Sequence, residues 1–246
     1  MIEASDMQVV IPSRKRVESC RHTITLFKNP IVCVDESEAE DYADVGAEIV
    51  THPRTYGLGE LRQWILDNFP QRVVVQCNDD VKSLQCCVGR HVRKITDADA
   101  IQQILLNSAN IAEFIGTSVF TYSPYGSDVR MCWSNDPIRF NRIEGCLFGM
   151  IGRKFRFDPK VRQHDDLDLT FQVLLKDRIV YMDSRFAPEH DFMTKAGGNS
   201  EIRGNAAMTE ELKYMRSKWG KYFGITRRKS MTSTAVGVKR RQQLKV

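Results

Sequence analysis

The chain has 246 residues, of which 42% are hydrophobic and 27% are charged, and its formal net charge is +5. This length and composition are ordinary for a soluble globular protein that forms one large domain or a domain with a tail. They exclude a membrane-spanning protein, since no apolar run approaches the length of a bilayer span, and the first residues lack the regions of a signal peptide.

The first half of the chain alternates short apolar runs with helical patterns. Such a β-α-β order predicts a parallel sheet with helices on its faces. We expect strands at 7–11, 31–34, 48–51 and 73–77, and helices at 19–27, 37–45 and 61–69. Further along we expect helices at 97–111, after Asp166 and at 210–219, and strands at 114–120, 142–151 and 179–183. Residues 82–91 are predicted to be helical or irregular.

Polar residues follow the first two predicted strands. Pro12, Ser13 and Arg14 come after the first strand, and Asp35 ends the second. Because open α/β sheets bind ligands beyond the carboxyl ends of their strands, Ser13 and Arg14 are suited to a base or phosphate, and Asp35 to ribose hydroxyls. Each residue alone is equally well explained as a turn residue or a solvated charge. Their repetition at successive strand ends favours a nucleotide site.

The fourth predicted strand runs directly into Asn78, Asp79 and Asp80. Acids clustered at the carboxyl end of a strand are hard oxygen ligands for Mg²⁺ or Mn²⁺, which are often shared with a diphosphate. An acidic turn that caps the next helix explains the same triplet equally well when it is considered alone. Gly57 and Gly59 precede the helix before this strand, and Arg62 in its first turn could reach phosphates or form a surface salt bridge.

A second acidic group follows His164 and consists of Asp165, Asp166 and Asp168. Capping of a helix and its dipole account for one acid at this position, but not for three. One of them, exposed in a cleft, could act as a general base.

Basic and glycine residues follow the last predicted strand. His190 precedes a glycine-rich segment with Lys195, Gly198 and Arg203, which could close over phosphates as a lid. A single histidine is more often a surface or hydrogen-bonding residue than a metal ligand.

The C-terminal segment is basic and contains no acid. Its charged residues between 227 and 246 are Arg227, Arg228, Lys229, Lys239, Arg240, Arg241 and Lys245. A segment of this kind favours phosphate polymers such as nucleic acids, although solvated basic ends are common. We therefore predict a folded domain at 1–225 and a basic, flexible tail at 226–246.

The cysteines predict the redox environment. The chain has seven of them, mainly in apolar segments such as 32–34 and 75–77. This usage indicates buried, reduced thiols rather than a disulfide framework, so we expect a cytoplasmic protein. Cys86 and Cys87 are adjacent and no Cys-x-x-Cys pair occurs, which argues against a zinc site.

From Met7 to about Tyr222, the order of these segments resembles the metal-dependent glycosyltransferase-A fold of nucleotide-sugar transferases. Residues 78–80 stand where that fold carries its Asp-x-Asp motif, and residues 165–169 resemble its Glu-Asp-x-Asp-Leu segment. The segments 62–66, 166–170 and 197–203 are similar to the TET-associated glycosyltransferases of phages, which attach sugars to 5-hydroxymethylpyrimidines in DNA.

The resemblance implies an α/β fold with a Rossmann-like mixed, mainly parallel sheet flanked by helices, and a catalytic domain at 1–225. It also implies that Mn²⁺ or Mg²⁺ is bound by Asp80 and His190, and that Asp166 is the catalytic base. The residues implied to bind the nucleotide sugar are Pro12, Ser13, Arg14, Asp35, Arg62, Asp79, Lys195, Gly198 and Arg203. Asn78 departs from the motif, because an amide replaces its first acid and lowers the charge at the metal.

The function implied by this resemblance is transfer of a hexose, with glucose from UDP-glucose as the first expectation, to the hydroxyl of 5-hydroxymethylcytosine in DNA. The expected partners are the nucleotide-sugar donor and DNA, with no membrane, and the location is the host cytoplasm if a phage encodes the protein. Inverting and retaining transfer are both open. One alternative keeps the fold with a glycan, lipid or protein acceptor, and another is a DNA-binding protein on a degenerate transferase scaffold.

Overall fold

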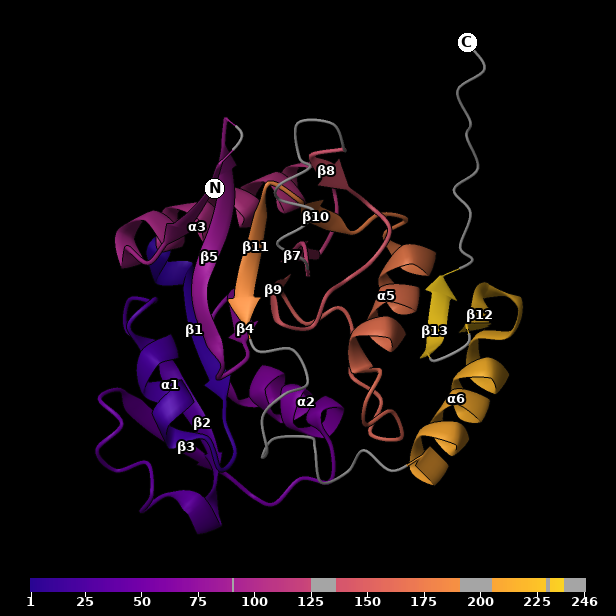
Figure 1. The fold of residues 1–246 in the computed structure, drawn as a ribbon, viewed down its shortest axis with the longest axis horizontal. Coiled ribbons are helices and arrows are strands. Elements are labelled where there is room, and N and C mark those ends of the chain that lie inside the picture. The colour runs from indigo at the N-terminus through magenta and orange to yellow at the C-terminus, as the bar shows by residue number, and fades with distance from the viewer. Residues whose placement is uncertain (90, 125–135, 191–204, 229–230, 237–246) are drawn as a thin grey trace.

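The computed structural model describes residues 1–89, 91–124, 136–190, 205–228 and 231–236 (Figure 1). Its centre is an eight-stranded sheet with the strand order β3-β2-β1-β4-β9-β7-β10-β8. The strands are β1 (Met7–Pro12), β2 (Ile31–Asp35), β3 (Glu48–His52), β4 (Val73–Cys77), β7 (Val119–Tyr122), β8 (Ile138–Arg139), β9 (Leu147–Ile151) and β10 (Tyr181–Asp183).

The strand directions make the sheet mixed but mainly parallel. Strands β1 to β4 pair in parallel, as do β7 and β10. Strand β9 runs antiparallel between β4 and β7, and β8 runs antiparallel to β10. This arrangement confirms the predicted fold class, and it brings the carboxyl ends of β1, β2 and β4 to one edge of the sheet.

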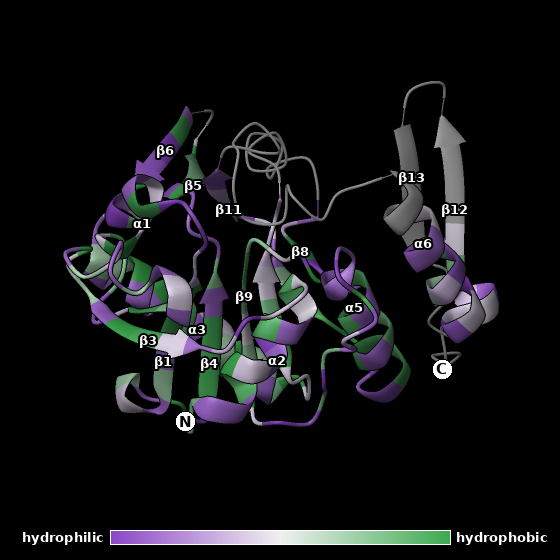
Figure 2. Cartoon of the chain, turned by 90° about the horizontal axis from the view of Figure 1, so that it is seen from below, coloured by the Kyte–Doolittle hydropathy of each residue, from purple (hydrophilic) through white to green (hydrophobic). Residues whose placement is uncertain are grey.

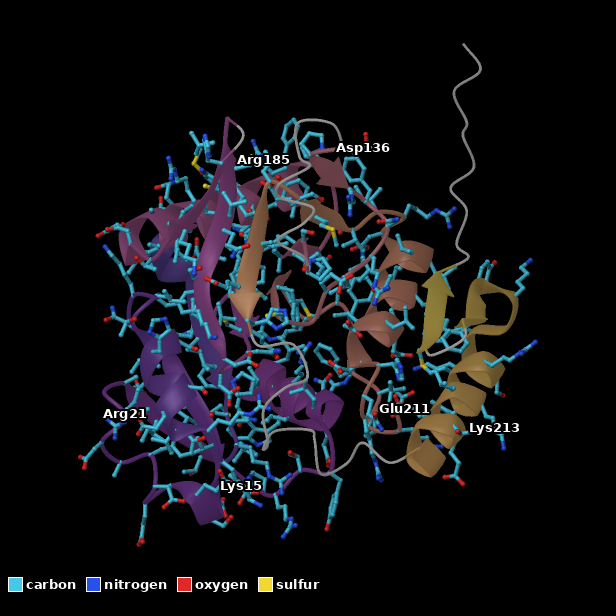
Figure 3. All side chains as sticks on the ribbon, viewed as in Figure 1. Lys15, Arg21, Asp136, Arg185, Glu211 and Lys213 are labelled. Carbon is cyan, nitrogen blue, oxygen red and sulfur yellow. The ribbon has the colours of Figure 1, made fainter. Side chains whose placement is uncertain are left out.

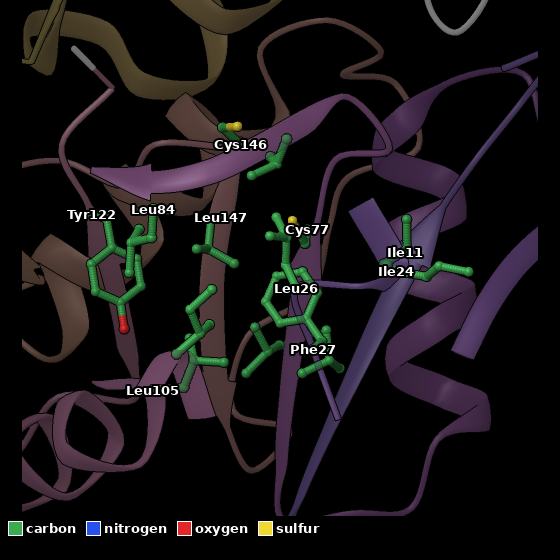
Figure 4. Packing of buried hydrophobic residues seen from close by; sticks show 14 of the residues in the cluster. Ile11, Ile24, Leu26, Phe27, Cys77, Leu84, Leu105, Tyr122, Cys146 and Leu147 are labelled. Carbon is green, nitrogen blue, oxygen red and sulfur yellow. The ribbon is translucent and has the colours of Figure 1, made fainter. Parts of the chain in front are cut away.

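Helices cover the two faces of the sheet. Helices α1 (Val17–Ile24) and α3 (Ala98–Phe114) pack on one face, and α2 (Leu58–Asn68) and α5 (Asp165–Lys176) pack on the other. Helix α6 (Asn205–Trp219) packs against α5, and the short 3₁₀ turns are η1 (Ala4–Asp6), η2 (Glu36–Glu38) and η4 (Gly220–Tyr222). Because successive side chains of a strand point to opposite faces, the strands divide the core into two clusters. Ile11 packs in one cluster with Ile24 of α1 and Leu105 of α3 (Figure 4), whereas Val10 packs in the other with Ile65 of α2.

Burial of the described cysteines agrees with the predicted buried thiols. Cys20, Cys33, Cys77 and Cys146 are buried and free, and burial raises the pKa of Cys20 and Cys33 to about 12. Cys86 and Cys87 are free and partly exposed. None of the helices in the described ranges combines the length and apolar character that a membrane span requires.

A second, antiparallel sheet corrects the prediction for residues 82–91. It consists of β5 (Val81–Val88), β6 (His91–Ile95) and β11 (Phe186–His190), in the order β11-β5-β6. Strand β5 alternates an exposed Lys82 with buried Val81 and Ser83, which is a strand pattern. The pattern is short, and β5 pairs both with the adjacent β6 and with β11, which lies about a hundred residues later in the sequence. The local sequence therefore did not show this sheet.

The end of the described chain packs against α5. Helix α6 is followed by an antiparallel hairpin of β12 (Phe223–Arg228) and β13 (Met231–Val236). Met215 and Phe223 form a small apolar cluster with Leu167 and Phe171 of α5. Strand β4 is mainly hydrophobic in colour, while α6 carries many hydrophilic residues (Figure 2). The predicted boundary after residue 225 lies inside β12.

Candidate active site

The carboxyl ends of β1 and β4 meet in a buried polar cluster. Ser13 Oγ donates a hydrogen bond of 2.6 Å to Asp79 Oδ2 and lies 2.7 Å from the hydroxyl of Tyr42. Arg16 Nη1 lies 3.3 Å from Asp79 Oδ1 and 3.6 Å from Asp80 Oδ2. The structure therefore brings Ser13 and Asp79 together as the parallel pairing of β1 and β4 requires. Arg16 and Tyr42 join them.

Asp79 and Asp80 differ in their partners, although both are buried. Burial raises the pKa of Asp79, while the hydrogen bond from Ser13 and the charge of Arg16 oppose this effect. Asp80 Oδ1 is buried and has no hydrogen-bond partner within the described ranges. An unpaired buried carboxylate oxygen is costly, and it fits a position that a cation fills.

His190 lies on the strand beside Asp80. In the pairing of β11 with β5, His190 is opposite Val81, the residue that follows Asp80, and the register shifts between Glu189 and His190. Across the described part of the chain, no group of three or more His, Cys, Asp or Glu could hold a metal ion. Asp80 and His190 would be only two protein ligands. This number fits Mg²⁺ or Mn²⁺, because such ions are commonly bound by one or two side chains together with substrate phosphates and water.

The predicted ribose and phosphate residues lie at the neighbouring strand ends. Pro12 is buried and pairs with Cys33 of β2. Asp35 begins η2 by accepting hydrogen bonds from Ser37, which hold the pKa of Asp35 below its usual value. Arg14 Nε lies 3.8 Å from Glu38 Oε1. These side chains occupy the same edge of the sheet as Ser13.

A loop joins the two acidic centres. The N–H of Asn78 donates to the carbonyl of Cys146 over 2.9 Å. A Cβ atom added to Gly145 would lie 3.3 Å from Asp166 Cβ, so the loop contacts the start of α5 closely. Asp166 is half-buried, and its Oδ1 accepts a 2.7 Å hydrogen bond from the N–H of Leu167.

Arg62 has different surroundings from those expected. Its side chain is only 2% exposed, donates a 2.6 Å hydrogen bond from Nη2 to the carbonyl of Gly145, and lies over the ring of Phe148. Nη1 is 3.0 Å from Asp165 Oδ2. Arg62 is therefore neither a surface salt bridge nor an exposed phosphate-binding arm. Arg62 instead supports the loop 144–146 and the first turn of α5 through its contacts with Gly145 and Asp165.

Burial raises the pKa of Asp165 to about 6, against the opposing charge of Arg62 and with a further increase from the neighbouring Asp166.

Lys195, Gly198 and Arg203 lie outside the described residues. Tyr42 has no separate signal in the sequence, and Arg16 is only one member of a basic cluster that follows the first strand.

Comparisons with known proteins identify the family and the fold. A sequence model of the family described as TET-Associated Glycosyltransferase matches residues 7–198. No curated protein was found to match the chain.

Two solved structures have a similar fold. Glucosyl-3-phosphoglycerate synthase from Mycobacterium tuberculosis, solved with Mn²⁺ and UDP, has 13% identity and a TM-score of 0.53, with 95% of this chain and 88% of that chain covered. Mannosyltransferase PcManGT from Pyrobaculum calidifontis, solved with GDP-Man and Mn²⁺, has 11% identity and a TM-score of 0.57, with coverages of 86% and 64%. The family match spans most of the chain, which therefore belongs to the TET-associated glycosyltransferase family.

Proposed function

We propose that this protein transfers a hexose from a nucleotide-sugar donor, UDP-glucose first, to the hydroxymethyl group of 5-hydroxymethylcytosine in DNA. Family membership supports sugar transfer. The observation that carries the mechanism is that two acidic centres, Asp79–Asp80 and Asp166, lie at the same edge of the sheet. The loop 144–146 contacts both of them.

Asp80 and His190 would bind Mn²⁺ or Mg²⁺ at the donor diphosphate. The unpaired Asp80 Oδ1 and the position of His190 on the adjacent strand support this assignment. A divalent ion bound there would neutralise charge on the departing nucleotide. Asp79 is engaged by Ser13 and Arg16, so its role is to fix the end of β4 and to contact the donor from there.

Asp166 would take the proton from the acceptor hydroxyl. The alcohol oxygen attacks the anomeric carbon as the bond from that carbon to the diphosphate oxygen breaks, and the proton moves to the Asp166 carboxylate. The beginning of α5 stabilises the negative charge of this carboxylate, and the Leu167 N–H orients it. In-line attack from the face opposite the leaving group inverts the anomeric configuration.

The basic C-terminal part of the chain would bind the DNA backbone. Glu211 is the last acidic residue, and eleven lysines and arginines follow it. Lys213 and Arg216 are exposed on α6. The absence of acidic residues from the sequence after Glu211 supports a polyanionic acceptor, because each phosphate contact by a lysine or arginine releases counterions. We propose that the catalytic domain covers 1–225 and that 226–246 supplies the remaining basic contacts.

Labelled sugar transfer tests the proposal. UDP-glucose with a labelled sugar is incubated with the protein, Mn²⁺ and either hydroxymethylated DNA, unmodified DNA or an oligosaccharide. We expect label only in the hydroxymethylated DNA, and none with Asp166→Asn. Label in the oligosaccharide and not in DNA would replace the DNA acceptor with a glycan.

A further inference from the structure

Helix α5, which carries Asp166, begins without a cap from its own sequence. His164 is at the N-cap position, and its side chain makes no capping hydrogen bond. Backbone N–H groups at the entry to a helix, like all backbone N–H groups shielded from water, need hydrogen-bond partners. Here those of Arg162, Gln163 and His164 all donate to the carboxylate of Glu211, at 2.7, 3.1 and 2.9 Å to the nearest oxygen.

Glu211 comes from α6, and it is 7% exposed. Figure 3 shows it on the side of α6 that faces the beginning of α5, with Lys213 further out. Successive backbone N–H groups in a turn form a concave anion site, and a carboxylate of the same chain fills it here. His164 Nδ1 is 2.7 Å from Glu211 Oε1, so a side chain joins the three backbone groups.

A second set of contacts binds the other end of α6 to the same turn of α5. Asp168 is 1% exposed, and its Oδ1 accepts a hydrogen bond of 2.8 Å from Trp219 Nε1. The same oxygen forms an ion pair with Lys218 Nζ at 2.8 Å. The ring of Trp219 stacks on Phe171 at 5.2 Å. Asp166 therefore lies between two positions, 164 and 168, that α6 holds.

Charge complementarity maintains this contact. Burial alone would raise the pKa of Glu211, but the hydrogen bonds from His164 and from the Arg162 N–H hold it below its usual value. Burial alone would lower the pKa of His164, but Glu211, with Asp166 and Asp165, raises it. Glu211 is thus ionised when it binds the turn.

We propose that Glu211 is a positioning residue for sugar transfer: by binding the N–H groups of residues 162–164, it fixes the first turn of α5 and with it the carboxylate of Asp166. This inference rests on the proposed role of Asp166 as the base. Glu211 lies beyond residues 7–198, the range that the family match covers. The reaction then depends on a helix outside that range.

The test compares Glu211→Gln with Glu210→Gln, an exposed neighbour on the same helix that loses the same charge. Glu211→Gln should lower kcat for hydroxymethylated DNA by roughly ten- to a hundredfold, because small displacements of a catalytic group have effects of this size. KM for UDP-glucose and the affinity for UDP with Mn²⁺ should stay within about twofold of wild type, because Asp80 and His190 are elsewhere. Glu210→Gln should change none of these quantities.

Hydrogen exchange separates this inference from the proposed acceptor. Amides 162–166 should exchange faster in Glu211→Gln than in Glu210→Gln, while those of β4 keep their protection, whatever the acceptor is. Unchanged exchange at 162–166, or unchanged kcat in an enzyme that Asp166→Asn inactivates, would overturn the positioning role. Absence of transfer to hydroxymethylated DNA by the wild type would contradict the proposed function alone, and the exchange result would still decide the positioning role.

Discussion

Asp165 and Asp166 are neighbours in the chain, yet their carboxylates have different surroundings. Asp165 is buried against Arg62, and Asp166 is half-buried at the start of α5. Adjacent acids whose environments differ commonly have separate roles in acid–base chemistry. In the proposed mechanism the accessible carboxylate of Asp166 meets the acceptor, whereas the buried carboxylate of Asp165 pairs with the arginine that supports the loop 144–146.

Replacement of the base tests this division of roles. Asp166→Asn keeps the size of the side chain and removes its ability to accept a proton. We expect kcat to fall by about 10²- to 10⁴-fold, with UDP binding in the presence of Mn²⁺ unchanged. Steady-state kinetics and calorimetry measure the two quantities. Full activity of this variant would assign the proton transfer to another group.

Asp165 should matter for stability more than for proton transfer. Asp165→Asn removes the counter-charge of Arg62, which is 2% exposed and donates to Gly145. Breaking a buried ion pair by removal of one partner costs about 3–5 kcal/mol. Urea denaturation should show a loss of this order. A loss below about 1 kcal/mol would mean that the pair contributes little to folding.

Asp80 is a proposed ligand of the divalent metal ion. Asp80→Ala should weaken binding of Mn²⁺ in the presence of UDP by more than about tenfold, because it removes a proposed ligand, and loss even of a group that only orients a ligand has an effect of about this size. Electron paramagnetic resonance of free Mn²⁺ measures this affinity directly. Asp99→Ala, on the exposed start of α3, is the matched control. Equal Mn²⁺ affinity of the two variants would exclude Asp80 as a ligand.

At the scale of elements, the contact between α5 and α6 should respond to pH. His164 has a raised pKa, so its contribution to stability is full below its ordinary value of 6.5 and is lost as pH rises through the folded-state pKa. Glu211 has a lowered pKa, so its contribution is present above 4.5 and is lost only in stronger acid. The ion pair of His164 with Glu211 therefore stabilises the contact between α5 and α6 most between about pH 4.5 and 6.5.

His164→Gln measures this dependence. The variant should lower the melting temperature more at pH 6 than at pH 9, because wild-type His164 loses its charge, and with it the ion pair, at the higher pH. His91→Gln, at an exposed histidine in β6, provides the comparison. An equal decrease at both pH values would show that the imidazolium charge does not stabilise the contact with α6.

Elements with a local pattern could be predicted, and those made by distant contacts could not. Strands β1, β2 and β4 are short β-branched runs ended by polar residues, and Asp97 caps α3 by accepting from the Ala100 N–H. The sheet and the strand ends that carry Ser13 and Asp79 follow from such signals. Strand β5 lacks such a signal, because its alternation is short and its place in the sheet, between β6 and the distant β11, is decided by pairing.

The same distinction applies to the candidate site. Arg62 was expected near phosphates from its place in a helical first turn, but its burial depends on Gly145 and Asp165, which are about a hundred residues away. Glu211 has no local signal, since its partners are backbone groups of another element. Residue type and spacing show which groups can perform chemistry, whereas tertiary contacts decide which of them are exposed.

For the whole molecule, the C-terminal part should separate DNA binding from donor chemistry. Phe223 is buried against Phe171, so a truncation after Gly224 keeps this contact and removes the basic residues from Arg227 onward. This variant should bind DNA more weakly, with a shallower dependence on salt, and should hydrolyse UDP-glucose at the wild-type rate. Equal loss of both activities would show that 225–246 is needed for the fold of the catalytic domain.

Mass spectrometry of nucleosides from hydroxymethylated DNA, after reaction with UDP-glucose and Mn²⁺, detects the proposed product itself. We expect a hexose on 5-hydroxymethyl-2′-deoxycytidine with the wild-type protein, and at least about a hundredfold slower formation of this product with either Asp166→Asn or Asp80→Ala. Unmodified nucleosides with the wild type across a panel of UDP- and GDP-sugars, or the same glycosylated nucleoside formed equally fast by all three proteins, would contradict this expectation.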